Sequence, residues 1–460
     1  MQKFVELLNT IVWNSPAALP VMIALLVGTG MFMTIRLGFI QIRYIGHAIN
    51  AVRGKYDTES DSGEISHFQA LATALSGTIG IGNIAGVATA IHYGGPGALF
   101  WMWVTGVFGT SLKFAECMLA VRYRKQNEDG SYSGGPMYYI REGLGWKPLA
   151  VLFAAAASIS AMGQGNSIQA FTVAHQLQTD FGIEPWITGL VLAVIVGSVI
   201  IGGIKRIASV TQILTPLMTV IYLAAGIIIL VVNLDRLPAA FSTIFSTAFS
   251  PPGVTGGFAG SFFMHTLIWG VKRGLFSNEA GQGSAAIAYS AAKTTEPVRE
   301  GTVAMLGPYI DTLIVCSITG LCITVTGAWS ATVHGEALNG SPLTAYAFET
   351  GLPFLHGYGR YIITAAVLLF ATSTIISWSY YGDRSFQFLL GDRAVMPYRY
   401  VYIAVLFTGT VAKLETVWGF GDFAIALMTV PNLIAILALS TTVRTEMKEY
   451  FHRHSGKHPK

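Results

Sequence analysis

The stretch Ser76-Gly77-Thr78-Ile79-Gly80-Ile81-Gly82-Asn83 lies in the middle of a hydrophobic run from about His67 to Ala90. The run is long enough to cross a bilayer, yet its centre holds glycines, each of which weakens a helix by about 1 kcal/mol relative to alanine. An opened helix inside a membrane leaves backbone N–H and C=O groups without partners, unless it lines a cavity or binds ions or a ligand. The stretch therefore predicts a transport site at mid-membrane, with a helix N-terminus for an anion and free carbonyls for a cation.

The composition indicates a polytopic membrane protein. Of the 460 residues, 52% are hydrophobic and 11% are charged, whereas a soluble domain carries about 25% charged residues. The net charge of +4 does not indicate nucleic-acid binding, because the basic residues lie in short loops between apolar runs. The 3 cysteines all lie within predicted spans, which argues against a disulfide framework or a metal cluster. No cleavable signal peptide is expected, because no small-residue cleavage site follows Lys3 and Glu6.

Apolar runs of about 20 residues predict about eleven membrane spans. They lie near 16–36, 67–92, 97–120, 149–174, 185–203, 210–233, 258–290, 302–327, 359–382, 398–412 and 417–440. The seventh is too long for one crossing, and two segments are expected to interrupt it, 270–274 and 277–283.

The distribution of basic residues predicts the orientation. Most of the 28 Lys and Arg residues fall in one set of loops, and the opposite set holds only Lys3, Arg236, Arg360 and Lys413. We therefore expect the N-terminus outside, the C-terminus in the cytoplasm and an odd number of spans.

The two interrupted spans occupy matching positions. Once the first span is set aside, five spans separate them, so that two halves start from opposite sides of the membrane. In such inverted repeats, corresponding broken helices form the site, whereas close packing of small residues is the better explanation for a single glycine-rich helix. The expected division is an N-terminal helix and basic loop at 1–60, a first repeat at 61–235, a second repeat at 236–441 and a cytoplasmic tail at 442–460.

The opened backbone is complementary to an amino-acid zwitterion. The carboxylate can accept hydrogen bonds from the N–H groups of Gly80, Ile81 and Gly82, where a half-helix begins and glycine permits close approach. The ammonium can bind carbonyls at Thr78 and around 276–281. Because glycine residues line this pocket, it leaves little room for a substrate side chain, which favours the amino acids glycine and alanine as substrates.

Polar and aromatic residues near the breaks are further candidates. Gln164 shares a helical face with Ile168 and Phe171, so we expect that face to meet the substrate; interhelical hydrogen bonding is the alternative. Trp378 and Trp269 are candidates for closing the pocket, with packing or interfacial anchoring as the alternative. The expected substrate-binding set is Thr78, Gly80, Ile81, Gly82, Gln164, Phe171, Trp269, Phe276, Asn278, Glu279 and Trp378.

Charged residues within spans are functional candidates by default. Glu279 lies in the second break and could bind the substrate ammonium or a proton, or pair with Lys272 or Arg273. Lys113 and Glu116 are expected to form a snorkelling pair near the cytoplasmic end of a span.

Several long motifs resemble the alanine or glycine:cation symporter (AGCS) family. They are Ser76–His92, Gly94–Trp103, Ser133–Ile140, Gly274–Ala292 and Trp378–Phe386. The resemblance implies an all-α, LeuT-like 5+5 inverted repeat with one extra N-terminal helix. It also implies symport of small neutral amino acids with sodium or protons across the plasma membrane of a prokaryote.

The resemblance further implies a sodium site between the first and eighth core helices. The carbonyls of Ser76 and Ile79 would face the carbonyl of Phe370 and the hydroxyls of Ser373 and Thr374. Back-bonding of the two hydroxyls to the preceding turn is the alternative. A second sodium could use Thr78, Asn83 and Asn278, with helix capping as the alternative for Asn83.

The expected partners are a small neutral amino acid, sodium or protons and membrane lipid, with sodium as coupling ion and no other cofactor. A passive channel or an amino-acid receptor on the same scaffold is the alternative, although a channel favours rings of like residues or a continuous polar stripe. No enzyme is expected, because neither H-E-x-x-H nor G-x-S-x-G occurs at membrane depth. The absence of G-x-x-x-x-G-K-[ST] excludes an ATP-driven pump in this chain.

Overall fold

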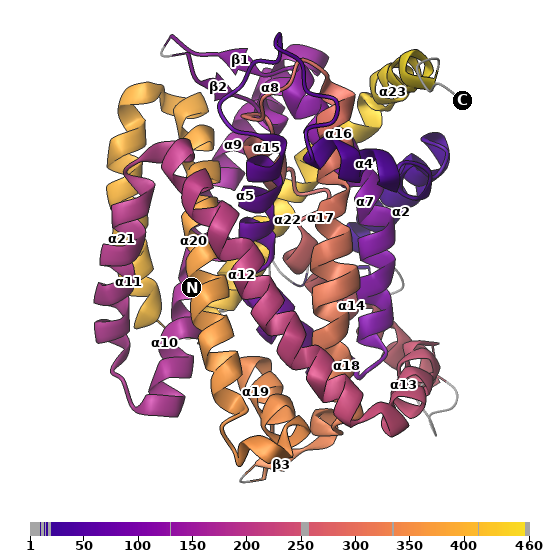
Figure 1. The fold of residues 1–460 in the computed structure, drawn as a ribbon, viewed down its shortest axis with the longest axis vertical. Coiled ribbons are helices and arrows are strands. Elements are labelled where there is room, and N and C mark those ends of the chain that lie inside the picture. The colour runs from indigo at the N-terminus through magenta and orange to yellow at the C-terminus, as the bar shows by residue number, and fades with distance from the viewer. Residues whose placement is uncertain are drawn as a thin grey trace.

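The computed structural model is a bundle of helices (Figure 1). It describes residues 10, 13, 15–16, 20–128, 130–249, 257–333, 335–412 and 414–455. Within these residues, 6 helices are long and apolar enough to cross a membrane, and a bent pair would make a seventh span. The all-α fold is confirmed, whereas the larger predicted number of spans and the predicted domain bounds stay predictions.

The first half of the fold is built on a bent pair of helices. α5 (His67–Thr78) begins with a capping box, and α6 (Ala85–Gly94) follows after the short 3₁₀ turn η1 (Ile81–Asn83), with a bend of 57°. Gly80 has φ −128° and ψ −154°, an extended backbone that no helix contains. The helices that follow are α7 (Ala98–Arg122), α9 (Lys147–Met162), α10 (Ile168–Phe181), α11 (Pro185–Ile200) and α12 (Gly203–Val232).

The second half contains the other break, between α14 (Gly257–Asn278) and α15 (Ser284–Tyr289). Gly281 and Gly283 have φ values of +85° and +82°, which glycine adopts without strain. The later helices are α16 (Pro297–Ala304), α17 (Leu306–Pro308), α18 (Ser317–Val325), α20 (Arg360–Leu390), α21 (Val395–Thr410) and α22 (Leu414–Ala438).

The predicted interruption at 270–274 is wrong, because α14 is continuous there. Gly270 serves packing instead: an added Cβ would lie 2.5 Å from the Ala98 carbonyl oxygen and from Trp101 Cβ. The glycine therefore allows α14 to approach α7 closely.

Two π-helical segments interrupt the long helices. They are η2 (Gly163–Ser167), between α9 and α10, and η4 (Tyr309–Cys316), between α17 and α18. π turns inside α-helices are rare and occur frequently at functional sites, and both segments contribute to the site described below.

Shorter elements surround this bundle. The helices are α2 (Val21–Arg36), α3 (Ile40–Arg43), α4 (Ile45–Val52), α8 (Pro136–Leu144), α13 (Leu237–Phe249), α19 (Gly340–Gly351) and α23 (Ser440–Ser455). The 3₁₀ turns are η3 (Leu234–Arg236), η5 (Ala328–Ser330), η6 (Pro353–Leu355) and η7 (Asp392–Ala394). Two antiparallel pairs join β1 (Lys125–Gln126) to β2 (Tyr132–Ser133) and β3 (Thr332–Val333) to β4 (Glu336–Ala337). The last five residues of the predicted tail, 456–460, lie outside the described residues.

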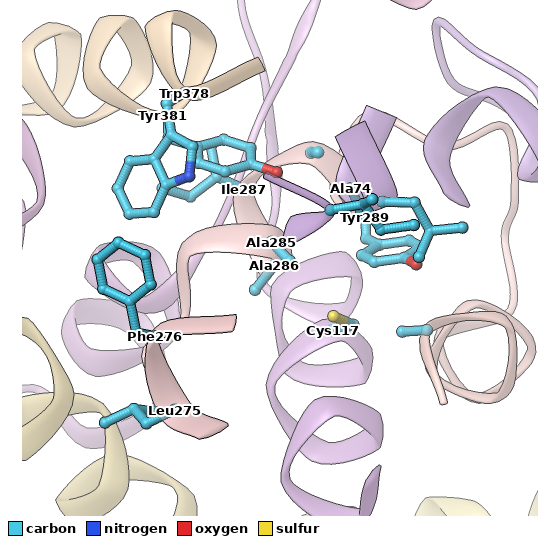
Figure 2. Packing of buried hydrophobic residues seen from close by; sticks show 14 of the residues in the cluster. Ala74, Cys117, Leu275, Phe276, Ala285, Ala286, Ile287, Tyr289, Trp378 and Tyr381 are labelled. Atoms are coloured by element: carbon cyan, nitrogen blue, oxygen red, sulfur yellow. The ribbon is translucent and has the colours of Figure 1, made fainter. Parts of the chain in front are cut away.

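The second break is enclosed by packed side chains (Figure 2). Leu275 and Phe276 precede it, and Trp378 and Tyr381 of α20 lie beside it with ring centroids 5.3 Å apart. All four side chains are buried. The irregular backbone therefore lies inside the protein, which is where a membrane permits it.

Candidate functional site

The two breaks lie against each other. A Cβ added at Gly82 would lie 3.0 Å from Phe276 Cδ1 and 3.2 Å from Ser277 Cα. Gln164 Nε2 donates a hydrogen bond to the Phe276 carbonyl at 3.4 Å. The structure thus brings together a glycine of the first break, the edge of the second break and the predicted glutamine.

The backbone N–H groups predicted to bind a carboxylate have protein acceptors. The Gly80 N–H donates to Asn83 Oδ1 at 3.0 Å, and the Ile81 N–H donates to Gln169 Oε1 at 3.2 Å. Gln169 Nε2 in turn donates to the Gln164 carbonyl at 3.2 Å. Asn83 therefore does cap the second half-helix, and Gln169 is a site residue that the sequence analysis missed.

The π-helix η2 explains this omission. In an α-helix Ile168 follows Gln164 on one face, but the wider π turn brings residue i+5 there instead. Gln169, five residues after Gln164, is therefore buried beside it, whereas the predicted substrate contact of the face with Gln164, Ile168 and Phe171 stays a prediction. The polar and small residues from 163 to 166 are the signal that could have indicated an irregular turn.

Glu279 is held inside the second break by polar side chains. Its backbone is left-handed, with φ 56°. Oε1 accepts a hydrogen bond from Trp378 Nε1 at 2.8 Å, and Oε2 accepts one from Ser284 Oγ at 2.5 Å. Trp378 is fully buried in this contact, so it fixes the carboxylate from α20.

The predicted ion pair of Glu279 with Lys272 or Arg273 is wrong. Both cations pair with Asp422 Oδ2 of α22, at 2.6 Å from Lys272 Nζ and 3.1 Å from Arg273 Nη2. Because α14 is unbroken between these cations and Asn278, they lie one to two turns away from the break. Asp422 was missed, although a lone acidic residue within an apolar span is itself a signal.

A cavity of about 280 Å³ lies beside these ion pairs, lined by residues of α6, α10, α14 and α22. Phe171 and Trp269 line it rather than the breaks. Trp418 also lines it and stacks on Phe276 with ring centroids 5.3 Å apart. This ring pair joins a lining residue of the cavity to Phe276, whose carbonyl Gln164 contacts.

The pair Lys113–Glu116 forms at 3.4 Å, but the predicted snorkelling is wrong because both side chains are buried. Glu116 Oε2 accepts the N–H groups of Gly281 at 3.2 Å and Gly283 at 3.1 Å, and Asn432 Nδ2 at 2.9 Å. The opened backbone of the second break needs acceptors for its N–H groups, and this carboxylate of α7 supplies them.

Oxygen atoms predicted for sodium gather between α5 and α20. The Ser76 carbonyl accepts hydrogen bonds from Thr374 Oγ1 at 3.0 Å and Ser373 Oγ at 3.4 Å. Ser373 Oγ also donates to the Phe370 carbonyl at 2.8 Å, the predicted back-bond. Ile79 is buried directly after α5, in the same break. Four of the five predicted ligands are thus joined by hydrogen bonds.

A second cluster centres on Asp311 in the π-helix η4. Its Oδ1 accepts a hydrogen bond from Asn83 Nδ2 at 2.7 Å, and its Oδ2 accepts from Ser277 Oγ at 2.9 Å and Thr312 Oγ1 at 2.7 Å. Asn278 Nδ2 reaches Thr312 Oγ1 at 3.2 Å. Asp311 is fully buried, and in the described part of the chain it forms no ion pair.

The structure does not join Thr78 to this cluster. Its hydroxyl donates to the Leu75 carbonyl at 3.3 Å, one turn earlier on α5. Asp311 takes the place that the sequence analysis gave to Thr78, and the lone acidic residue in the span 302–327 is the signal that could have indicated it.

At the C-terminal end of α15, away from the second break, Arg124 hydrogen-bonds several segments together. Its guanidinium donates to the carbonyls of Ser290, Ala292, Ser62 and Thr294, at 2.9, 2.7, 2.8 and 2.6 Å. These bonds join the end of α7 to the end of α15 and to the loop before α5. The breaks thus have a cavity on one side and a hydrogen-bonded closure on the other.

Comparison with known proteins agrees with this arrangement. MhsT in complex with L-phenylalanine has the same fold, with a TM-score of 0.60 and 16% identity over 84% of this chain and 93% of MhsT. The sodium/alanine symporter AgcS of Methanococcus maripaludis is 46% identical over 97% of each chain. The probable sodium/glutamine symporter GlnT of Bacillus subtilis is 33% identical over 100% of this chain and 93% of GlnT. Residues 1–460 match the sodium:alanine symporter family, and the chain belongs to that family.

Proposed function

We propose that this protein is a cation-coupled symporter that carries a small neutral amino acid across the membrane by alternating access. The observation that carries the proposal is the contact of two broken helices at Gly82 and Phe276, between an accessible cavity and the Arg124 closure. The family consists of transporters rather than enzymes. We place the protein in the plasma membrane of a prokaryote because of its family, and we place its N-terminus outside because of the distribution of basic loop residues.

The substrate site lies where the two breaks meet. The substrate carboxylate would replace Asn83 and Gln169 as acceptor for the N–H groups of Gly80 and Ile81. The ammonium would bind near Glu279 and the Phe276 carbonyl, which Gln164 now contacts. Thr78, Asn278 and Trp378 complete this site, and Phe171 and Trp269 line the approach to it.

The size of the substrate follows from packing. AgcS is named for alanine and GlnT for glutamine, so membership of the family does not determine the size of the substrate's side chain. At Gly82 even a methyl group would press on Phe276 and on the Ser277 backbone. This space favours alanine and glycine over a longer side chain.

Sodium is the proposed coupling ion, bound by the carbonyls of Ser76, Ile79 and Phe370 and the hydroxyls of Ser373 and Thr374. Oxygen ligands from α5 and α20 suit a hard cation. Because α5 belongs to the first break, a cation there stabilises the conformation that receives the substrate.

A second cation is proposed beside Asp311, with Asn83 and Asn278. A buried carboxylate without a cationic partner is costly by several kcal/mol, and a bound cation would offset that penalty. Ser277 and Thr312 present further oxygens there.

The function is tested by uptake of labelled alanine into proteoliposomes, with an imposed sodium gradient compared with an imposed pH gradient. Accumulation above equilibrium with sodium alone is expected. Accumulation with the pH gradient alone would replace sodium by protons and point to Glu279 or Asp311 as carrier. Equilibration without accumulation would contradict symport and favour a passive channel, and binding without uptake would favour a receptor.

The Asp311→Asn variant tests the second cation. Asparagine can keep hydrogen bonds to Asn83 and Ser277 but removes the charge, so the number of positive charges moved per alanine should fall by about one. The reversal potential of alanine uptake at set gradients measures this number. Asp235→Asn, at an exposed carboxylate, is the control and should leave it unchanged; an unchanged value in Asp311→Asn would refute the second site.

A further inference from the structure

A second cavity, lined by basic residues, lies at the end of α2 and includes no residue of the two helix breaks. It has a volume of about 520 Å³ and lies between the end of α2, α3 and α23; Figure 1 labels α2 and α23 at the upper right of the molecule. Its cationic lining residues include Arg36, Arg43, Arg444 and Lys448, and no Asp or Glu lines it among the described residues. None of these four cations forms an ion pair within that part of the chain.

Contacts within the protein hold Arg36 and α23 in place, but none of the four cations is paired with a carboxylate of the described residues. Arg36 Nη2 donates to Thr441 Oγ1 at 2.7 Å and so joins α2 to α23. Arg36 Nε is buried and has no hydrogen-bond partner in the described residues. Tyr44 stacks on Phe451 with ring centroids 3.5 Å apart, which fixes α23 against the segment between α3 and α4. A guanidinium that is held in place and has no anionic partner among the described residues suits an oxyanion such as phosphate.

Apolar side chains adjoin the cations on the outer surface. Ile35 also lines the cavity and is 67% exposed, and Ile42 is 66% exposed. Phe32 and Phe39 are exposed as well, and the Arg36 guanidinium lies 5.5 Å from the Phe32 ring centroid. A ligand that fills the cavity with an anion would therefore meet an apolar surface directly beside it.

We propose that this cavity binds the headgroup of an anionic phospholipid. The phosphate accepts hydrogen bonds from Arg36 and Arg43, Arg444 and Lys448 add positive charge, and the acyl chains lie along the apolar surface of α2. Basic pockets at the ends of membrane helices bind anionic lipid headgroups in this way. A soluble phosphate would use the cations but not the apolar surface, so the combination of both favours a lipid.

The test compares lipid retention in purified full-length protein. Wild type and the triple variant Arg43→Gln, Arg444→Gln, Lys448→Gln are incubated with equal amounts of phosphatidylglycerol and phosphatidylcholine. Bound lipid is then extracted and quantified, and the melting temperature is recorded with each lipid. All three side chains are exposed, so the triple variant should fold. The matched control is Lys205→Gln, Arg206→Gln, Lys293→Gln, which removes three exposed charges from predicted loops of the same set.

Wild type and control should retain phosphatidylglycerol preferentially, and the cavity variant should retain at least about tenfold less, given the contribution of each basic residue near a lipid surface. An equal loss in the control would overturn the proposal in favour of general charge attraction. Retention unchanged in the cavity variant would also overturn it. The melting temperature is also recorded with glycerol 3-phosphate. If this compound raises the melting temperature as much as phosphatidylglycerol does, the cavity binds a soluble phosphate and the lipid proposal is overturned.

Discussion

Replacing both Ser373 and Thr374 by alanine should raise the sodium concentration for half-maximal alanine uptake about tenfold to a hundredfold. The variant removes two hydroxyls that contact the Ser76 carbonyl across α5 and α20. A hydrogen bond to a charged group is worth about 1.5–3 kcal/mol, and we expect a similar loss when a hydroxyl ligand of sodium is removed. Each 1.4 kcal/mol corresponds to about tenfold in affinity. Initial uptake rates against sodium concentration, at saturating alanine, measure the effect.

A matched variant separates ion binding from stability of the helix. Thr372→Ala with Ser379→Ala also removes two hydroxyls from α20, but these donate only to Leu368 and Ile376 of the same helix. The control should keep wild-type sodium activation. If the Ser373 and Thr374 variant does so too, the two hydroxyls are back-bonded side chains and the proposed cage is refuted.

The positions of the two breaks could be predicted from the sequence because glycine acts locally. At Gly80 and Gly281 the weakness of the helix is a property of the residue itself, and the structure opens at both. At Gly270 the same residue type allows close packing of α14 on α7, and composition alone does not separate these two uses.

The contacts that the sequence analysis missed have two physical causes. Gln169 lies in the first turn of α10, just beyond η2, and Asp311 lies within η4; a π turn shifts every following side chain relative to the α-helical period. Asp422, which was missed, and Glu116, whose contact with the second break was missed, both reach groups on other helices. Such contacts depend on how helices pack and leave no periodic pattern in either segment.

Replacing Gly82 by leucine should reduce alanine uptake to below about 1% of wild type while the protein remains folded. A Cβ at this position lies 3.0 Å from Phe276 Cδ1 and 3.2 Å from Ser277 Cα, so a longer side chain must enter the proposed substrate site or separate the two breaks. Overpacking a core costs about 1–3 kcal/mol, which a protein with 5–15 kcal/mol of stability tolerates. Size-exclusion profiles and uptake rates, normalised to protein in the membrane, test both parts.

The decisive comparison uses Gly86, one turn beyond Gly82 and also buried. A Cβ at Gly86 would lie 4.0 Å from the Ile81 carbonyl oxygen, an ordinary van der Waals distance, so Gly86→Ala should transport nearly as wild type. Gly82→Ala should already lose most activity, because its methyl group meets backbone that cannot move aside without opening the break. Equal activity of the two alanine variants would show that contact between the breaks is not required for transport, and the proposed site would have to lie elsewhere.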